Sequence, residues 1–537
     1  PMVGPGGRPE EGSVPRTRTH RTRTRTRTRR TAATAAVGVL ALAAALGAAP
    51  AEQDHGLRWG ACPEPHVPDG MRCATLDVPL DYSGTHKGHV RLALARIPAA
   101  EPHRRLGSLV LNYGGPGAPG IANLAADPKA FAELGKRYDL VAFDPRGVGH
   151  SDPVSCGRGQ GKGEGEETVE TAETATAQLA ALRAEVRRCE RASGPVLPYI
   201  GTVNVSRDMD RIRQALGEDK LDFLGFSYGT RLGAVYAAQF PDKTGRMVLD
   251  GVDTLGEPLS EQALVSARGQ QRALDNFLTW CAHLPGCVYG TNTRTAKEKV
   301  AALVERLDHE PLIGDDGSPV TGQDAVAAIG AALYSKAMWP DLAAALALVE
   351  RDHDPVGLLQ LGGPTDVTPG GGGDGDGGTG TGAVPADNAT SALIAVNCAD
   401  DPDRLKTKGS QAATARALVE VQNGLRDEFL EASKIFGPNQ LATVLACYGR
   451  PAGTDFIRRI DHPGAPRMLL VGTRGDPATP YEWTEETAKR LGSAVIVDFK
   501  GDGHTGYSSS RCVQEYVDRF LVDGRLPSGT RACPAGE

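Results

Sequence analysis

A serine between two glycines stands where an apolar run passes into a helical run, and this feature constrains the fold most. The apolar run is Leu221–Gly225, the motif Gly-Phe-Ser-Tyr-Gly occupies 225–229, and the helical pattern follows over Arg231–Gln239. A serine exposed on a tight strand-to-helix turn needs glycines on both sides, because the turn has no room for side chains there. This context predicts that Ser227 is a nucleophile; the alternative is an ordinary glycine-rich turn.

Two late apolar runs end in the residues that a serine nucleophile requires. Residues 468–472 lead to Asp476, and residues 494–499 lead to His504. A serine hydroxyl needs a base, the base needs an orienting acid, and this type of fold supplies them in the order Ser, acid, His. Asp502 is a second candidate acid, but it lies too near the histidine in sequence to reach its Nδ1. We therefore predict Asp476 and His504 as the partners of the serine.

A glycine-rich segment after an earlier apolar run predicts an oxyanion hole. Residues 112–117, Asn-Tyr-Gly-Gly-Pro-Gly, follow the run Ser108–Leu111. The oxyanion needs preorganised N–H donors, and glycines let the backbone approach a substrate closely. We assign one donor to the N–H of Tyr228, the residue after the nucleophile, and the other to Gly115. A plain Gly/Pro turn would explain the composition of this segment but not its location.

The spacing of apolar runs predicts an α/β-hydrolase fold with a mostly parallel, doubly wound sheet. Residues 74–80 and 89–97 alternate and predict an antiparallel pair. Continuous runs are typical of strands buried on both faces, and they occur at 108–111, 138–143, 221–225, 246–249, 467–472 and 494–499. Helical patterns separate them, as at 177–191, 206–216 and 230–239.

A chain of 537 residues exceeds what one core usually organises, so we expect an insertion or a second domain. Residues 257–449 do not show the alternation of strand and helix patterns, and their apolar spacing is helical. This predicts a helical cap inserted between two strands. Within it, residues 362–382 consist almost entirely of Gly, Asp, Thr and Pro, which predicts a disordered loop. The hydrolase core would then comprise residues 52–256 and 450–537.

The N-terminal segment predicts export. A basic Arg-Thr repeat over Arg16–Arg30 precedes an Ala/Leu-rich stretch and small residues near position 50, so residues 1–51 read as a signal peptide. A retained membrane anchor is the alternative, but Ala and Gly insert weakly. The net charge of -7, with arginine concentrated before residue 31, gives no support to a nucleic-acid surface. We expect a secreted or cell-wall-associated protein without stable membrane association after cleavage.

Ten cysteines follow the predicted signal, and an even number in an exported chain suggests disulfides. The connectivity is open from sequence, and the simplest pairing joins neighbours. That pairing would give Cys62–Cys73, Cys156–Cys189, Cys281–Cys287, Cys398–Cys447 and Cys512–Cys533. No CxxC pair or His/Cys cluster has metal-ligand spacing, so no metal or cofactor is expected.

The segment after residues 138–143 carries two charged residues that invite a catalytic interpretation. These are Asp144 and Arg146, in the sequence Asp-Pro-Arg-Gly. An ion pair between them that shapes the turn is the simpler reading, and we leave them out of the catalytic set.

Together these motifs resemble the exported actinobacterial tripeptidyl aminopeptidase family of serine peptidases, relatives of prolyl aminopeptidase. The resemblance spans about residues 58–533 and is most specific from the Ser-Tyr-Gly-Thr of 227–230 to the Leu-Asp-Gly-Val of 249–252. Two departures are Tyr113, where relatives carry His or Pro, and Pro119, where they usually carry Ser. The resemblance implies release of tripeptides, similar short peptides or single residues from free N-termini.

An aminopeptidase also needs an anion for the ammonium group of its substrate. Five acids near the predicted cap are candidates, none preferred: Asp250, Asp253, Glu257, Asp400 and Asp401. A carboxylesterase or lactonase with the same triad is the alternative activity. A secreted binding protein on a hydrolase scaffold is disfavoured, because all triad positions and the oxyanion loop are filled.

Overall fold

The computed structural model describes residues 56–536, except 65, 158–171, 316, 363–382, 403–410, 449, 451, 456–459 and 461–463. The predicted signal peptide at 1–51 lies outside the described residues. So does the predicted loop at 362–382, apart from Gly362, which ends a helix. In the described part of the chain, no helix combines the length and apolar character needed to cross a bilayer.

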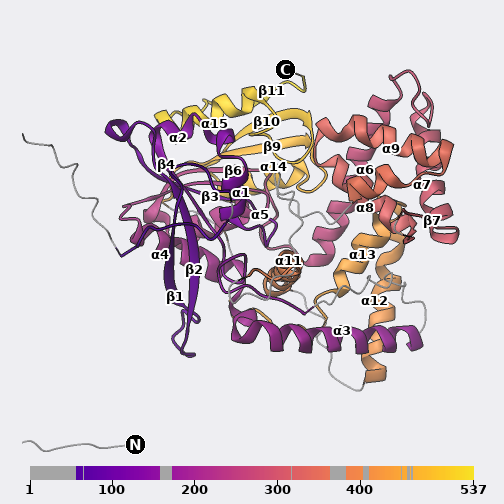
Figure 1. The fold of residues 1–537 in the computed structure, drawn as a ribbon, viewed down its shortest axis with the longest axis horizontal. Coiled ribbons are helices and arrows are strands. Elements are labelled where there is room, and N and C mark those ends of the chain that lie inside the picture. Colours follow the sequence, from indigo (N-terminus) through magenta and orange to yellow (C-terminus); the bar gives the residue numbers. More distant parts are fainter. Residues whose placement is uncertain are drawn as a thin grey trace, which may run out of the picture. The chain divides into compact units, whose positions relative to one another are not determined.

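A nine-stranded sheet forms the centre of the fold (Figure 1), in the order β1-β2-β4-β3-β5-β6-β9-β10-β11. Strands β1 and β2 are antiparallel, as predicted, β2 is also antiparallel to β4, and all other neighbours are parallel. The strands are β1 Arg72–Pro79, β2 His89–Ile97, β3 Gly107–Asn112, β4 Tyr138–Phe143, β5 Leu221–Phe226, β6 Thr244–Asp250, β9 Leu469–Gly475, β10 Val495–Asp502 and β11 Arg531–Cys533. The α/β-hydrolase class and its mostly parallel sheet are confirmed.

The continuous apolar strands are buried on both faces by helices. Val110 of β3 joins one apolar cluster, while its neighbours Leu109 and Leu111 join the other. One cluster includes residues of α4 and α5, and the other includes residues of α1 and α15. The helices of this part are α1 Gly120–Ala126, α2 Leu134–Arg137, α3 Ala172–Ser193, α4 Thr202–Ala215, α5 Tyr228–Gln239, α14 Tyr481–Leu491 and α15 Arg511–Asp523.

The chain between β6 and β9, here called the helical insertion, is mainly helical (Figure 1). It contains α6 Leu259–Cys281, α7 Thr293–His309, α8 Gly322–Leu333, α9 Trp339–Asp352, α10 Val356–Gly362, α11 Asn388–Asp400, α12 Gln411–Ala432, α13 Gly437–Leu445 and the short hairpin of β7 Leu312–Ile313 and β8 Pro319–Val320. The insertion has its own apolar cluster, which includes Phe277 and Trp339. Helix α3 precedes the insertion in sequence but packs against α12 through Leu179 and Leu418.

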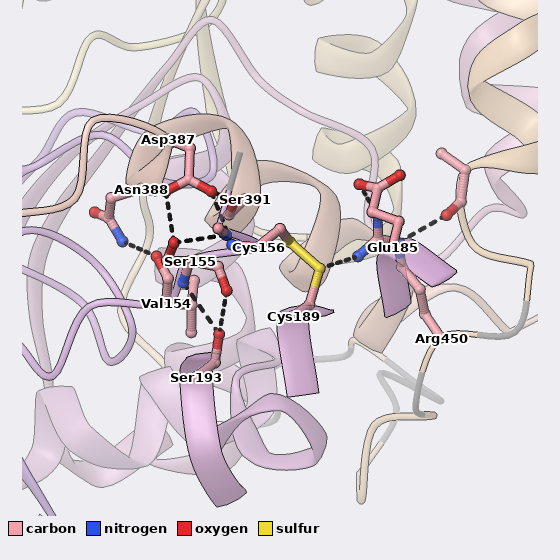
Figure 2. The surroundings of a disulfide bond; sticks show 12 residues. Val154, Ser155, Cys156, Glu185, Cys189, Ser193, Asp387, Asn388, Ser391 and Arg450 are labelled. Carbon is pink, nitrogen blue, oxygen red and sulfur yellow. Dashed lines mark hydrogen bonds and ion pairs between the residues drawn. A yellow bond between two sulfur atoms is a disulfide. The ribbon is translucent and has the colours of Figure 1, made fainter. Parts of the chain in front are cut away.

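All ten cysteines form disulfides, and the predicted neighbour pairing is confirmed: Cys62–Cys73, Cys156–Cys189, Cys281–Cys287, Cys398–Cys447 and Cys512–Cys533. Figure 2 shows the second of these beside the start of α11. There the Asp387 carboxylate accepts hydrogen bonds from the Ser155 hydroxyl at 2.7 Å and from the Cys156 N–H at 2.8 Å. This disulfide therefore crosslinks the loop whose residues Ser155 and Cys156 are hydrogen-bonded to Asp387 of the helical insertion.

The predicted ion pair between Asp144 and Arg146 is wrong. The Arg146 guanidinium is fully buried and pairs with Asp208 of α4, at 2.6 and 2.7 Å. Asp144 instead accepts the backbone N–H groups of Ile121 and His150, at 3.0 and 2.8 Å. The partner of the arginine is 62 residues away in sequence, so only the packing of α4 reveals it. Both groups are structural, as expected.

Candidate active site

Ser227 lies on a strained turn between β5 and α5. Its backbone has φ 54° and ψ −127°, a conformation that residues other than glycine rarely adopt. A Cβ on Gly225 would come within 2.5 Å of the Gly229 carbonyl oxygen, and one on Gly229 within 2.7 Å of the Asn112 side chain. The two glycines of the motif are therefore required by close backbone approach, as the sequence pattern indicates.

Asp476 and His504, which the sequence places after β9 and within the loop after β10, are in direct contact. His504 Nδ1 lies 2.9 and 3.0 Å from the two carboxylate oxygens of Asp476. Because an ionised carboxylate only accepts hydrogen bonds, Nδ1 carries the proton and Nε2 remains free to accept one. Asp476 is buried and also accepts the hydroxyl of Thr479 at 2.9 Å, which holds the carboxylate in place.

The electrostatics of this pair suit a general base. Burial alone would lower the pKa of His504, but the negative charge of Asp476 and its hydrogen bond outweigh burial, so the pKa lies above the usual 6.5. The histidine thus holds a proton more readily than a free imidazole. That favours the imidazolium that forms when a serine gives up its proton.

Ser227 and His504 lie on either side of the turn that follows β6. The Ser227 N–H donates to the carbonyl of Asp250 at 2.9 Å, and a Cβ on the next residue, Gly251, would lie 3.5 Å from His504 Cε1. Among the described residues, the Ser227 hydroxyl makes no hydrogen bond to His504. Such catalytic hydrogen bonds are often long before substrate binds and shorten in the substrate complex.

Asp250 links the turn that carries Ser227 to the loop that carries His504. Its carboxylate is fully buried and accepts the N–H of Gly506 at 2.9 Å and that of Tyr507 at 2.8 Å, just beyond His504. Burial raises the pKa of Asp250 to about 6. Asp502, the competing acid, instead binds Asn276 and Lys336 of the helical insertion, each at 2.8 Å.

The predicted oxyanion loop packs against the nucleophile turn. A Cβ on Gly114 would lie 2.9 Å from Ser227 Cβ and 3.1 Å from the backbone nitrogen of Tyr228. Tyr228 is the first residue of α5, so its N–H has no acceptor within the helix. Its hydroxyl contacts the Thr202 hydroxyl at 2.6 Å. Gly115, the other predicted donor, lines the same cavity as Ser227.

A cavity of about 230 Å³ adjoins Ser227. Its wall comes from the oxyanion loop, the turn after β6, the loop after β9 and helices of the insertion. The lining residues are Gly115, Pro116, Ser227, Arg231, Asp253, Leu259, Gln262, Ala263, Ser266, Gln270, Tyr334, Asn397, Gln440, Thr443, Pro477, Ala478, Thr479 and Trp483. A larger hollow of about 410 Å³, on α6 and the end of α12, contains none of the predicted catalytic residues.

Sequence reasoning missed Tyr334, which follows α8 in the helical insertion. The edge of its ring meets the His504 imidazole at 5.1 Å between centroids, and its carbonyl accepts the His504 N–H at 2.8 Å. Only the packing of the insertion brings it to the histidine, so no local pattern signals it. Tyr113, one of the two departures from the family pattern, packs against Phe131 and Phe226 and is absent from the cavity lining.

Known proteins resemble this chain over almost its whole length. A family model described as TAP-like protein matches residues 433–533, and one described as alpha/beta hydrolase fold matches residues 107–359. Serine protease Hip1 of Mycobacterium tuberculosis is 33% identical over 500 residues, covering 89% of this chain and 91% of that protein. Carboxylesterase B of the same species is 33% identical over 477 residues, covering 86% of each. Tripeptidyl aminopeptidase of Streptomyces lividans is 29% identical over 507 residues, covering 91% of this chain and 88% of that protein.

Proposed function

The chain belongs to the tripeptidyl aminopeptidase family of α/β-hydrolase serine enzymes, and from this premise we propose that it is a secreted exopeptidase. It releases tripeptides, similar short peptides or single residues from free N-termini. Ser227, His504 and Asp476 form its catalytic triad, and the N–H groups of Gly115 and Tyr228 form its oxyanion hole. Five disulfides and the signal-like N-terminus support export.

In the proposed mechanism, Ser227 Oγ attacks the scissile carbonyl carbon while His504 Nε2 takes its proton. Asp476 keeps the imidazole oriented through Nδ1 and stabilises its positive charge. The oxyanion lies between the two backbone donors, and the proton passes from His504 to the leaving amine. Water, deprotonated by the same histidine, then hydrolyses the acyl-enzyme and frees Ser227.

The observation that carries the exopeptidase proposal is the wall that the helical insertion contributes to the cavity beside Ser227. Helices α6, α11 and α13 of the insertion supply its wall beyond Ser227, through Gln262, Asn397 and Gln440 among others. We expect such a wall to restrict how far a peptide extends past Ser227, which favours the end of a chain over the middle of a long one. We therefore infer that the helical insertion acts as a cap that limits how many residues precede the cleaved bond.

A carboxylesterase is the second candidate, because carboxylesterase B matches at the same identity as the serine protease. The deciding assay compares aminoacyl, dipeptidyl and tripeptidyl chromogenic amides, each with a free or an acetylated N-terminus, with simple esters. Preferred cleavage of one free-N-terminal amide series supports the exopeptidase. Hydrolysis of esters alone supports the esterase, and activity retained in Ser227→Ala refutes the proposed nucleophile.

A further inference from the structure

An aminopeptidase must recognise the charged end of its substrate, and one acid is placed to do so. We propose that the Asp253 carboxylate, held by Arg231, binds the α-ammonium group of the peptide whose scissile carbonyl meets Ser227. This inference rests on the proposed exopeptidase function and names its specificity residue. Of the five candidate acids, Asp253 is the one that lines the cavity shared with Ser227.

The other four acids do not line the cavity, and each has partners of its own. Asp250 binds the loop of His504, and Glu257 pairs with Arg490 and accepts backbone N–H groups at Leu255 and Gly256. Asp400 accepts the N–H and hydroxyl of Thr202, at 2.9 and 2.5 Å, and Asp401 accepts the N–H of Leu259 at 3.3 Å. Their local roles explain their presence without a substrate.

Asp253 is tied to the nucleophile by a short chain of hydrogen bonds. Its backbone N–H donates to the Thr230 hydroxyl at 2.8 Å, and that hydroxyl donates to the Ser227 carbonyl at 2.6 Å. Its Oδ2 lies 3.0 Å from the Arg231 guanidinium, and its Oδ1 accepts the N–H of Thr254 at 2.8 Å. The carboxylate therefore has a fixed place relative to the reacting serine, as recognition of a chain end requires.

Asp253 shares its arginine partner with a second carboxylate. Arg231 is buried between two carboxylates, Asp253 at 3.0 Å and Asp400 at 3.8 Å. Its remaining donors go to neutral acceptors, the Thr254 carbonyl and the Gln262 side chain. Burial raises the pKa of Asp400 despite the nearby arginine. An ammonium group at Asp253 would add a second cation beside these two carboxylates.

The rest of the lining suits an uncharged peptide backbone. Arg231 and Asp253 are the charged residues among those that line the cavity, and the other polar side chains are neutral, among them Gln262, Gln270, Asn397 and Gln440. Amides and hydroxyls both donate and accept, so they match peptide N–H and C=O groups. An acetylated N-terminus lacks the positive charge and could not form an ion pair with the Asp253 carboxylate.

The test compares kcat/KM for free and N-acetylated forms of the same peptide amide in the native enzyme, Asp253→Asn and Asp275→Asn. Asp275 pairs with Lys297 on the helical insertion and does not line the cavity, so it is the matched control. In Asp253→Asn, the ratio of kcat/KM for the free peptide to kcat/KM for the acetylated peptide should fall by roughly 30-fold or more. The fall should come from a lower kcat/KM for the free peptide. It should be unchanged in Asp275→Asn.

A pH profile gives a second readout. With the free peptide, kcat/KM should decline as the substrate ammonium loses its proton near pH ~8, and this decline should disappear in Asp253→Asn. Arg231, Asp400, the Tyr228 ring and His504 are the charged and titratable groups around Asp253, and the charge of Asp253 contributes to the raised pKa of His504. If Asp253→Asn does not fold, Asp253→Glu takes its place, because it keeps the negative charge but displaces it. The preference for the free over the acetylated peptide should then be smaller in Asp253→Glu than in the native enzyme.

The outcomes separate the two proposals. A native enzyme that cleaves acetylated peptides as well as free ones refutes the exopeptidase function itself. A native enzyme with a strong preference that survives unchanged in folded Asp253 variants refutes only the assignment of Asp253.

Discussion

The backbone carbonyl of Asp250 accepts the N–H of Ser227 at 2.9 Å, and this contact joins the end of β6 to the turn that carries the proposed nucleophile. The carboxylate of the same residue holds the backbone just beyond His504. One residue thus fixes the relative position of two loops that come from distant parts of the chain. Its importance lies in positioning, because neither interaction touches the reacting atoms.

Replacing Asp250 by Asn should loosen the histidine loop. Asn offers one acceptor oxygen and turns an NH₂ group toward N–H donors, so unfolding free energy should fall by about 1–3 kcal/mol and kcat by roughly ten-fold. Denaturant unfolding and steady-state kinetics measure both. Asp518→Asn is the control, since Asp518 contacts the same loop only through the Tyr507 hydroxyl. Unchanged kcat in Asp250→Asn would contradict the positioning role.

The pH dependence of hydrolysis should report the pair of His504 and Asp476. The raised pKa of His504 means that the active, neutral imidazole is lost as pH falls, with a midpoint above 6.5. In Asp476→Asn the stabilising charge is gone, so this midpoint should move to lower pH, while kcat drops by roughly 10³-fold or more. An ester substrate isolates the effect, because it carries no ammonium group. A midpoint that does not move would exclude Asp476 as the partner.

Tyr334 should support the histidine through its ring and its backbone. Tyr334→Phe keeps both and should retain nearly full kcat, whereas Tyr334→Ala removes the edge contact with the imidazole and should lower kcat roughly five-fold. Steady-state kinetics on one peptide amide and one ester measure the effect. Equal loss in both variants would show that the hydroxyl, not the ring, matters.

The disulfide between Cys156 and Cys189 should contribute more stability than the one between Cys281 and Cys287. The first closes a loop with a separation of 33 residues and the second one of only 6. Loop-closure entropy predicts losses of about 3–4 and about 2 kcal/mol for the paired Cys→Ser variants. Denaturant unfolding of the two double variants tests this order. A reversed order would show that the loop at α11 gains little from its crosslink.

Local patterns were enough to predict much of this molecule. The strands β3, β4, β5, β6, β9 and β10 have continuous apolar runs because both faces of the large sheet are covered. The glycines around Ser227 are there because the turn admits no side chain. Strand β11, at Arg531–Cys533, escaped prediction because three residues are too few to show a period. The hairpin of β7 and β8 escaped for the same reason.

Contacts between distant segments had no such signal. Arg146 was expected to pair with Asp144, two residues away, but the packing of α4 brings Asp208 to its guanidinium instead. Likewise, the five acids near the insertion look alike in sequence, and only the burial and partners of each one distinguish Asp253.

The sequence by itself determined the fold class and the order Ser227, Asp476, His504, whereas the pairing of neighbouring cysteines was only its simplest arrangement until the structure showed it. These depend on short-range rules: periodicity, the needs of a tight turn and spacing along the chain. Tertiary structure alone decided which acid faces the cavity and that Tyr334 meets the histidine. The reason is physical: a side chain's charge and contacts depend on which groups fold against it, and those groups lie tens or hundreds of residues away.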